Sequence, residues 1–507
     1  MATQAPVRRL TSSENAPLIL LGLAIVCLHT IANSQYGFHR DELQTISNAR
    51  SLAWGYVEYP PVTALFARIE LGLFGTSLRG IRFFATLAEA MGVVLTGLAA
   101  RELGGGRYAQ VVAATAVAIG GHSLFSGSFL SYTSFDYLWW ILAGYFVIRL
   151  LRTGDPRWWI AIGVTIGVGM LTKYTMSLLA MGVIAGVLLA PVRRHLLSLW
   201  FWCGVALAIV VMLPNLVWQV HHQFVYFDFV RSIHARDVSW GRADNFLLNQ
   251  LWRSAHPVSV PLWLAGLFFV FRSEEGRRYR ILGWMYVVPL LVLLITRGRD
   301  YYLAPAYPML IAAGAVFGER WLHSRQPATA ISIRHTVAWS LASAGVITIA
   351  VTLPLAPLNS TWWRVAEAMN GNFNYEIGWP ELAQAVSQVR STLPAAEQAS
   401  IGILVHDDGQ AGALNLFGPA HRLPRTMSGM NSNWRRGYTS PAPQVVIVFG
   451  FGNEFLDNTF QSCEVAGRVA TPFGIDNGAL RSNAPIYVCR HLRQPWPEFW
   501  RNFQYFG

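Results

Sequence analysis

The feature that most constrains this chain is a series of apolar segments, each about as long as a lipid bilayer is thick. The segments lie near 16–34, 79–100, 108–127, 135–151, 157–172, 174–191, 198–216, 257–271, 281–296, 303–320 and 335–354. A helix needs roughly 17–25 apolar residues to cross a hydrocarbon core of ~30 Å. Most segments meet this length, although 157–172 and 281–296 are slightly short. We therefore expect a mainly α-helical, polytopic membrane protein with about eleven transmembrane helices.

The distribution of charge supports this expectation and gives the chain an orientation. Of 507 residues only 13% are charged, and the net charge is +12. A soluble domain carries about 25% charged residues. Arginine gathers in alternate loops, as expected for cytoplasmic loops. These loops are 101–107, 149–157, 191–195, 271–280 and 319–335, and the tail 1–15 lies on the same side. The positive charge is thus explained by the bilayer, and we expect no nucleic-acid partner.

Residues 372–507 differ in character from the apolar segments. The stretch GWPELAQAVSQVRSTL has helical periodicity, and IGILVH, QVVIVFG and PIYVCR resemble short buried strands. An odd number of spans places this part outside, so we predict an extracytoplasmic α/β domain. Cys463 and Cys489 both lie in it, and an oxidising compartment favours a disulfide between them. Cys27 and Cys203 fall in spans and are expected to stay unpaired.

The first outer loop, 35–78, contains two amphipathic segments. Leu43, Ile46 and Ala49 recur at helical spacing, and Pro61 is placed to start a second helix. Two helices that lie in the membrane interface explain this pattern better than a soluble loop does.

The stretch FHRDEL opens the first of these helices with four ionisable side chains, His39, Arg40, Asp41 and Glu42. Carboxylates in a first turn interact favourably with the helix dipole, so they could simply stabilise the helix start. Together with Glu58 in the following turn, they could instead provide a general base beside a site that excludes water. The spacing alone leaves both interpretations open.

Several motifs together resemble one family. They include FHRDELQTISNARSLAWGYVEYPPVTALFARI, RELGGGRYAQ, SYTSFDYLWW, LTKYT, LPNLVWQ and YYLAPAYPMLIAAGA. The chain resembles bacterial membrane glycosyltransferases of the dolichyl-phosphate-mannose protein mannosyltransferase type, which are glycosyltransferase family 39-like proteins with the GT-C fold. The resemblance implies that residues 16–355 form the catalytic membrane domain in the bacterial inner membrane. It also implies transfer of a sugar from a polyprenyl-phosphate donor to a protein, lipid or glycan hydroxyl on the outer face. It identifies neither the sugar nor the acceptor.

The resemblance also implies roles for the acids. The acid at the start of the first outer loop is the family's general base, and this role falls on Asp41, with Glu42 beside it. Glu58 fills the acidic position in the following turn. In SYTSFD, Thr133 occupies a position that is often acidic, while Asp136 keeps a later one. A divalent metal therefore remains an open question.

Binding of the donor phosphate requires cations near the outer interface. We expect substrate-binding side chains in FHRDEL, SYTSFD, LTKYT and RGRDYY. These are His39, Arg40, Asp136, Lys173, Tyr174, Arg297, Arg299, Tyr301 and Tyr302. Arginine has the fork geometry that phosphate prefers. The alternatives are that Lys173 snorkels to the interface and that the arginines contact lipid headgroups.

Two alternatives from other classes compete with an enzyme. A transporter of a lipid-linked or anionic substrate would place charges in the middle of the bundle and show internal repeats. Only Glu89 lies clearly within a span, with no evident role, and no repeat is visible. A non-catalytic envelope assembly protein would bind its partner through the outer domain.

Overall fold

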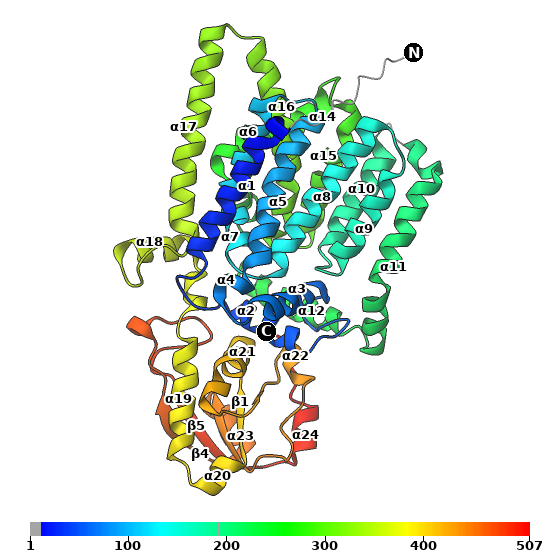
Figure 1. The fold of residues 1–507 in the computed structure, drawn as a ribbon. Coiled ribbons are helices and arrows are strands. Elements are labelled where there is room, and N and C mark those ends of the chain that lie inside the picture. The colour runs from blue at the N-terminus through cyan, green and yellow to red at the C-terminus, as the bar shows by residue number, and fades with distance from the viewer. Residues whose placement is uncertain (1–11, 191–192) are drawn as a thin grey trace.

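The computed structural model describes residues 12–190 and 193–507 and has two parts. A bundle of long helices stands above a smaller domain that contains a β-sheet (Figure 1). The bundle helices are α1 (Ser12–Ala32), α5 (Phe83–Glu102), α6 (Arg107–Ala118), α7 (Gly121–Ser128), α8 (Tyr132–Thr153), α9 (Trp158–Met170), α10 (Met176–Leu189), α11 (Leu199–His221), α14 (Val260–Arg272), α15 (Arg280–Ile295), α16 (Tyr307–His323) and α17 (Pro327–Thr352).

The described residues contain seven helices that are long and apolar enough to cross a membrane. Two bent pairs raise this number to nine if each counts as one span. One pair is α6 with α7, bent by 62°, and the other joins Phe246–Ser254 to Pro257–Arg272 at 96°. The apolar helices α9 and α10 are shorter, with 13 and 14 residues. The predicted polytopic helical fold is thus confirmed, while the number of eleven spans stays a prediction.

Between the bundle and the sheet domain lie α2 (Arg40–Arg50), α3 (Val62–Phe74) and α4 (Leu78–Ile81) (Figure 1). The two helices expected in the first outer loop are therefore present. The expectation that both lie in the membrane interface is wrong for α2. Leu43, Ile46 and Ala49 are buried in a core that they share with Leu414 of the sheet domain. The apolar stripe of α2 is thus covered by protein and not by lipid.

The outer segment between α11 and α14 is also largely helical. It contains α12 (Val225–Ser239) and α13 (Phe246–Asn249). In Figure 1, α12 lies at the same level as α2 and α3. It thereby brings Asp237 into contact with Arg299, which precedes the 3-10 helix Asp300–Ala306.

The C-terminal domain has a five-stranded sheet with the order β2-β1-β3-β5-β4. The strands are β1 (Ile401–Val405), β2 (Thr426–Met427), β3 (Val445–Phe449), β4 (Phe460–Arg468) and β5 (Pro485–Leu492). Strands β1, β2 and β3 are parallel, and β5 and β4 continue the sheet in antiparallel fashion. The helices that follow α17 in the chain are α18 (Thr361–Asn370), which precedes the domain, and α19 (Trp379–Thr392), α20 (Ala395–Ala399), α21 (Asp408–Phe417), α22 (Asn431–Trp434), α23 (Asn453–Thr459) and α24 (Trp496–Arg501).

The predicted strands coincide with β1, β3 and β5, and the predicted helix with α19. The prediction missed β2, which has two residues, and β4, an edge strand on which only Phe460 is buried. Neither has the apolar run that marks a buried strand. Cys463 on β4 faces Cys489 on β5, and the two sulfur atoms form a disulfide with a length of 2.03 Å.

Candidate active site

The site begins at the N-terminus of α2, which His39 caps. The backbone N–H of Asp41 donates to His39 Nδ1 over 3.1 Å, and the N–H of His39 donates to Glu42 Oε2 over 2.7 Å. The imidazole is buried and packs on Phe129, with 4.5 Å between the ring centroids. This arrangement fixes the direction in which the next side chains leave the helix.

Glu42 is the most completely paired acid of the first outer loop. Its Oε1 accepts from Arg82 Nε at 2.9 Å and from the backbone N–H of Leu130 at 2.8 Å. Its Oε2 accepts from Arg82 Nη2 at 2.8 Å. Both side chains are fully buried, and Arg82 also pairs with Glu376 at 3.4 Å. Because a buried charge is costly without its partner, the carboxylate serves first to anchor α2 to the start of α5.

Glu58 is also buried, and both of its carboxylate oxygens accept hydrogen bonds. Its Oε1 accepts from the amides of Gln44 and Asn48, each at 2.8 Å. Its Oε2 accepts from the hydroxyl of Ser432 at 2.6 Å. The side chain therefore ties the turn after α2 to both that helix and the C-terminal domain.

Asp41 differs from both of these acids because its side chain is 51% exposed. Its ion-pair partner is Arg40, whose Nε lies 3.5 Å from Oδ1 and whose guanidinium also lies over the ring of Tyr375. The surrounding protein tends to raise the pKa of Asp41, but His39, Arg40 and Arg299 outweigh that effect and lower it. The carboxylate is thus ionised at neutral pH and still open to a ligand.

Lys173 lies in the turn between α9 and α10 and points toward the same region. Its Nζ donates to the backbone carbonyl of Glu58 at 3.3 Å and lies 4.0 Å from the ring centroid of Tyr132. Burial and the charge of Arg299 lower the pKa of Lys173 to about 7, against the opposing effects of Asp136, Glu58 and Asp41. In the described part of the chain the ammonium has one hydrogen bond, so two of its three donors are free for an anion.

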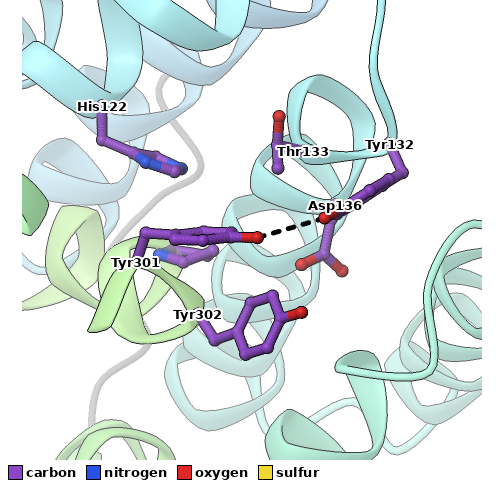
Figure 2. A pocket seen from close by; sticks show the side chains of 7 residues that line it. His122, Tyr132, Thr133, Asp136, Tyr301 and Tyr302 are labelled. Atoms are coloured by element: carbon purple, nitrogen blue, oxygen red, sulfur yellow. Dashed lines mark hydrogen bonds between the residues drawn. The ribbon is translucent and has the colours of Figure 1, made fainter. Parts of the chain in front are cut away.

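Arg299 completes the cationic side of the site. Its Nε donates to Asp237 Oδ2 at 2.5 Å, and its Nη1 donates to the hydroxyl of Tyr301 at 3.0 Å. The hydroxyls of Tyr301 and Tyr132 lie 3.2 Å apart. Figure 2 shows the tyrosines around a small pocket, which is lined by His122, Tyr132, Thr133, Asp136, Tyr301, Tyr302 and Pro305.

Asp136 contributes a carboxylate to this pocket from the first turns of α8. Its Oδ2 accepts from the hydroxyl of Thr175 at 3.1 Å. Its Oδ1 is buried and has no hydrogen-bond partner among the described residues. The indole N–H of Trp140, one turn further along α8, also lacks a partner in the described part of the chain and is the neighbouring donor that acts on this carboxyl.

Two of the expected residues are used differently. Arg297 pairs with Asp244 at 3.0 Å, and both side chains are more than half exposed. Tyr174 donates its hydroxyl to Asn215 and packs against Tyr226 with ring centroids 4.4 Å apart. Arg297 is thus engaged in a surface pair, whereas Tyr174 forms part of the wall beside Lys173.

The remaining polar groups do not form an evident metal centre. Within residues 12–190 and 193–507, no group of three His, Cys, Asp or Glu side chains is arranged to hold a metal ion.

Glu89 pairs with His29 at 2.6 Å, and both are fully buried between α1 and α5. This pair gives Glu89 a structural partner that the sequence alone did not indicate.

Sequence reasoning missed Arg82, Tyr132 and Asp237. Arg82 lies inside a segment that was expected to cross the membrane. An ionisable residue within such a segment is expensive to bury and therefore indicates a functional or paired position. Tyr132 and Asp237 carry no comparable signal, because their importance comes from contacts with Lys173 and Arg299.

In comparisons with known proteins, the sequence of this chain is similar to those of membrane glycosyltransferases. The model of the dolichyl-phosphate-mannose-protein mannosyltransferase family matches residues 58–218, so the match begins at Glu58 and does not include Asp41. Lipid A galacturonosyltransferase RgtD from Rhizobium johnstonii is 27% identical over 303 residues, which are 57% of this chain and 62% of that protein.

A second curated relative is undecaprenyl phosphate-alpha-4-amino-4-deoxy-L-arabinose arabinosyl transferase 1 from Pseudomonas fluorescens. It is 25% identical over 381 residues, which are 68% of this chain and 65% of the relative. This chain thus matches less than two thirds of the length of either relative.

Among solved structures, ArnT from Cupriavidus metallidurans bound to undecaprenyl phosphate superposes with a TM-score of 0.55 at 14% identity. The match covers 94% of this chain and 98% of ArnT, and it shows a shared fold. The sequence matches and this shared fold agree with the resemblance to GT-C-type glycosyltransferases that the motifs indicate.

Proposed function

We propose that this protein is a glycosyltransferase that moves a sugar from a polyprenyl-phosphate donor to an acceptor hydroxyl. Its curated relatives are named as a galacturonosyltransferase and as an arabinosyl transferase of an undecaprenyl-phosphate-linked sugar. The related ArnT structure contains undecaprenyl phosphate. These names describe what the relatives act on.

The observation that carries the proposal is the combination of an open, ionised carboxylate with a cationic pocket. Asp41 is half exposed, and its charge acts on Lys173 and Arg299. A general base must be ionised and accessible to the proton that it accepts. A leaving phosphate is stabilised by charge-assisted hydrogen bonds from an ammonium and a guanidinium.

The reaction follows from these roles. The acceptor hydroxyl transfers its proton to Asp41, and its oxygen attacks the anomeric carbon of the sugar from the face opposite the phosphate. The bond between the anomeric carbon and the phosphate oxygen breaks, and the lipid phosphate leaves against Lys173 and Arg299. A single displacement inverts the anomeric configuration.

The other predicted residues take supporting roles. Glu42 and Glu58 already accept hydrogen bonds at both oxygens, so we assign them to positioning and not to proton transfer. Arg40 holds Asp41 from one side. Asp136 and the tyrosines of the small pocket are placed to contact polar groups of the donor.

The test is a transfer assay with purified protein and a polyprenyl-phosphate sugar that carries a radiolabel in the sugar. We expect Asp41→Asn to lose about 10²–10⁴-fold in turnover, because Asn cannot accept a proton at neutral pH. Binding of undecaprenyl phosphate by this variant should persist. Near-normal turnover of Asp41→Asn would reject the base assignment. Movement of the intact donor lipid across vesicles without any transfer would favour a transporter instead.

A further inference from the structure

The helix that carries Asp41 is packed directly on the C-terminal domain. In Figure 1, α21 lies immediately below α2. A Cβ atom at Gly412 of α21 would lie 2.7 Å from both the backbone carbon and the backbone oxygen of Leu43. No side chain fits at that distance unless the two helices separate. The closest part of this interface therefore requires glycine at position 412.

A buried polar seam continues this contact toward the turn after α2. The hydroxyl of Ser432 donates to Glu58 Oε2 at 2.6 Å and accepts from the N–H of Val57 at 2.9 Å. The amide of Asn433 donates to Gln44 Oε1 at 3.0 Å. These groups lie between the two parts of the protein and satisfy one another, so separation would leave several buried polar groups unpaired.

The topology of the sheet explains why this edge of the domain is used. The parallel strands β1 and β2 end at Val405 and Met427, and their carboxyl ends lead into α21 and α22. In open α/β sheets, binding sites form outside the carboxyl ends of the strands. Here that edge of the sheet binds the first outer loop of the same chain.

The seam reaches the two groups that the proposed reaction needs most. Asp41 projects from the first turn of α2, the helix that Gly412 contacts. Glu58, whose side chain Ser432 holds, offers its backbone carbonyl to Lys173 Nζ at 3.3 Å. The same interface thus contacts the helix that carries Asp41 and the turn that contacts Lys173.

We propose that the C-terminal domain completes the active site, with Gly412 and Ser432 as positioning residues for Asp41 and Lys173 respectively. This inference rests on the proposed function for the reaction that it serves. It assigns to the domain the positioning of groups that take part in the chemistry.

The test uses the purified full-length protein and compares Gly412→Ala with Gly452→Ala. Gly452 lies in the same domain, and a Cβ there would meet nothing within 4 Å, so it is a matched control. We expect faster hydrogen exchange in residues 40–50 of Gly412→Ala and a kcat lower by about 10²-fold, because a displacement of about 1 Å can cost that much. Gly452→Ala should match the wild type in both measurements.

A second pair of variants tests the link to Lys173. Ser432→Ala should raise the donor KM and weaken binding of undecaprenyl phosphate by about tenfold, because the hydrogen bond to a charged group is lost. Ser432→Thr keeps the hydroxyl and should restore most of that affinity. A purely structural role would lower the melting temperature without this split between the donor KM and kcat.

The outcomes separate the two proposals. If exchange in α2 and kcat of Gly412→Ala equal those of Gly452→Ala, the positioning role is overturned. Faster exchange in α2 with unchanged kcat overturns it as well. If the wild type transfers no sugar, the proposed function fails. In that case, exchange in α2 and undecaprenyl phosphate binding by the two variants still decide whether the domain holds this site together.

Discussion

At the scale of single residues, the three acids Asp41, Glu42 and Glu58 of the first outer loop have three different environments. Glu42 is fully buried against Arg82, and Glu58 is buried against amides and a hydroxyl. Asp41 is half exposed, with an arginine at its side. The chemistry available to a carboxylate depends on these partners, since a saturated carboxylate cannot accept a proton without losing them.

Replacement of Glu42 by glutamine should mainly destabilise the protein. It leaves the charge of Arg82 buried with only Glu376 as an acidic partner, and breaking such a pair costs about 3–5 kcal/mol. We expect a clear drop in the melting temperature of Glu42→Gln, measured in detergent. Asp41→Asn should melt close to the wild type. Equal melting temperatures for all three proteins would contradict the anchoring role.

Binding of undecaprenyl phosphate should weaken above pH 7. In the empty site burial lowers the pKa of Lys173 to about 7, so the ammonium is present below this pH and is lost as pH rises through it. A bound phosphate favours the ammonium, so affinity should fall by up to about tenfold per pH unit above pH 7. Lys173→Arg keeps its charge and should show a flat profile from about pH 7.5 to about 9, where the phosphate is fully ionised. A flat profile in the wild type would contradict this role.

At the scale of elements, α2 and α3 have similar apolar patterns but different surroundings. The stripe of α2 is covered by α21, whereas Leu65, Ile69 and Leu73 of α3 remain exposed. A periodic apolar face shows that one side of a helix is shielded from water. It does not show whether lipid or protein shields that side. For α2, the C-terminal domain packs against the apolar face and covers it.

A matched pair of truncations should separate the two surroundings. Leu43→Ala removes a fully buried side chain from the core and should cost about 2–5 kcal/mol. Leu65→Ala, at a side chain that is 44% exposed, should cost about 0.5 kcal/mol or less. Unfolding of the purified protein would measure both values. A larger loss for Leu65→Ala than for Leu43→Ala would contradict the observed packing of α2.

At the scale of the whole molecule, the arginine-rich loops and the C-terminal domain lie at opposite ends of the bundle (Figure 1). The loops after α5, α8 and α14 are at the upper end, and the sheet domain is at the lower end. From the positive-inside rule we expect the upper end to face the cytoplasm. The candidate site lies at the lower end, which this orientation would place on the extracytoplasmic side, as the proposed reaction requires.

Reporter fusions test this orientation. A reporter placed after residue 360 should be extracytoplasmic, and one placed at Gly105, in the turn between α5 and α6, should be cytoplasmic. Alkaline phosphatase and a fluorescent protein that matures only in the cytoplasm would give opposite readings at the two positions. Cytoplasmic fluorescence from the fusion after residue 360 would overturn the orientation.

The sequence by itself determined the apolar helical character of the bundle and three strands of the C-terminal domain, and it gave the hypothesis for the region of the site. These depend on hydrophobicity along a short stretch, or on motifs that recur within a family. Only the tertiary structure decided which acid stays open, because Glu42 is bound by Arg82, 40 residues away, and Glu58 by Ser432, 374 residues away. Likewise, only the packed domain shows that α2 avoids lipid. Tertiary packing brings these distant residues together, and a local pattern of residues does not predict contacts between residues that are far apart in the chain.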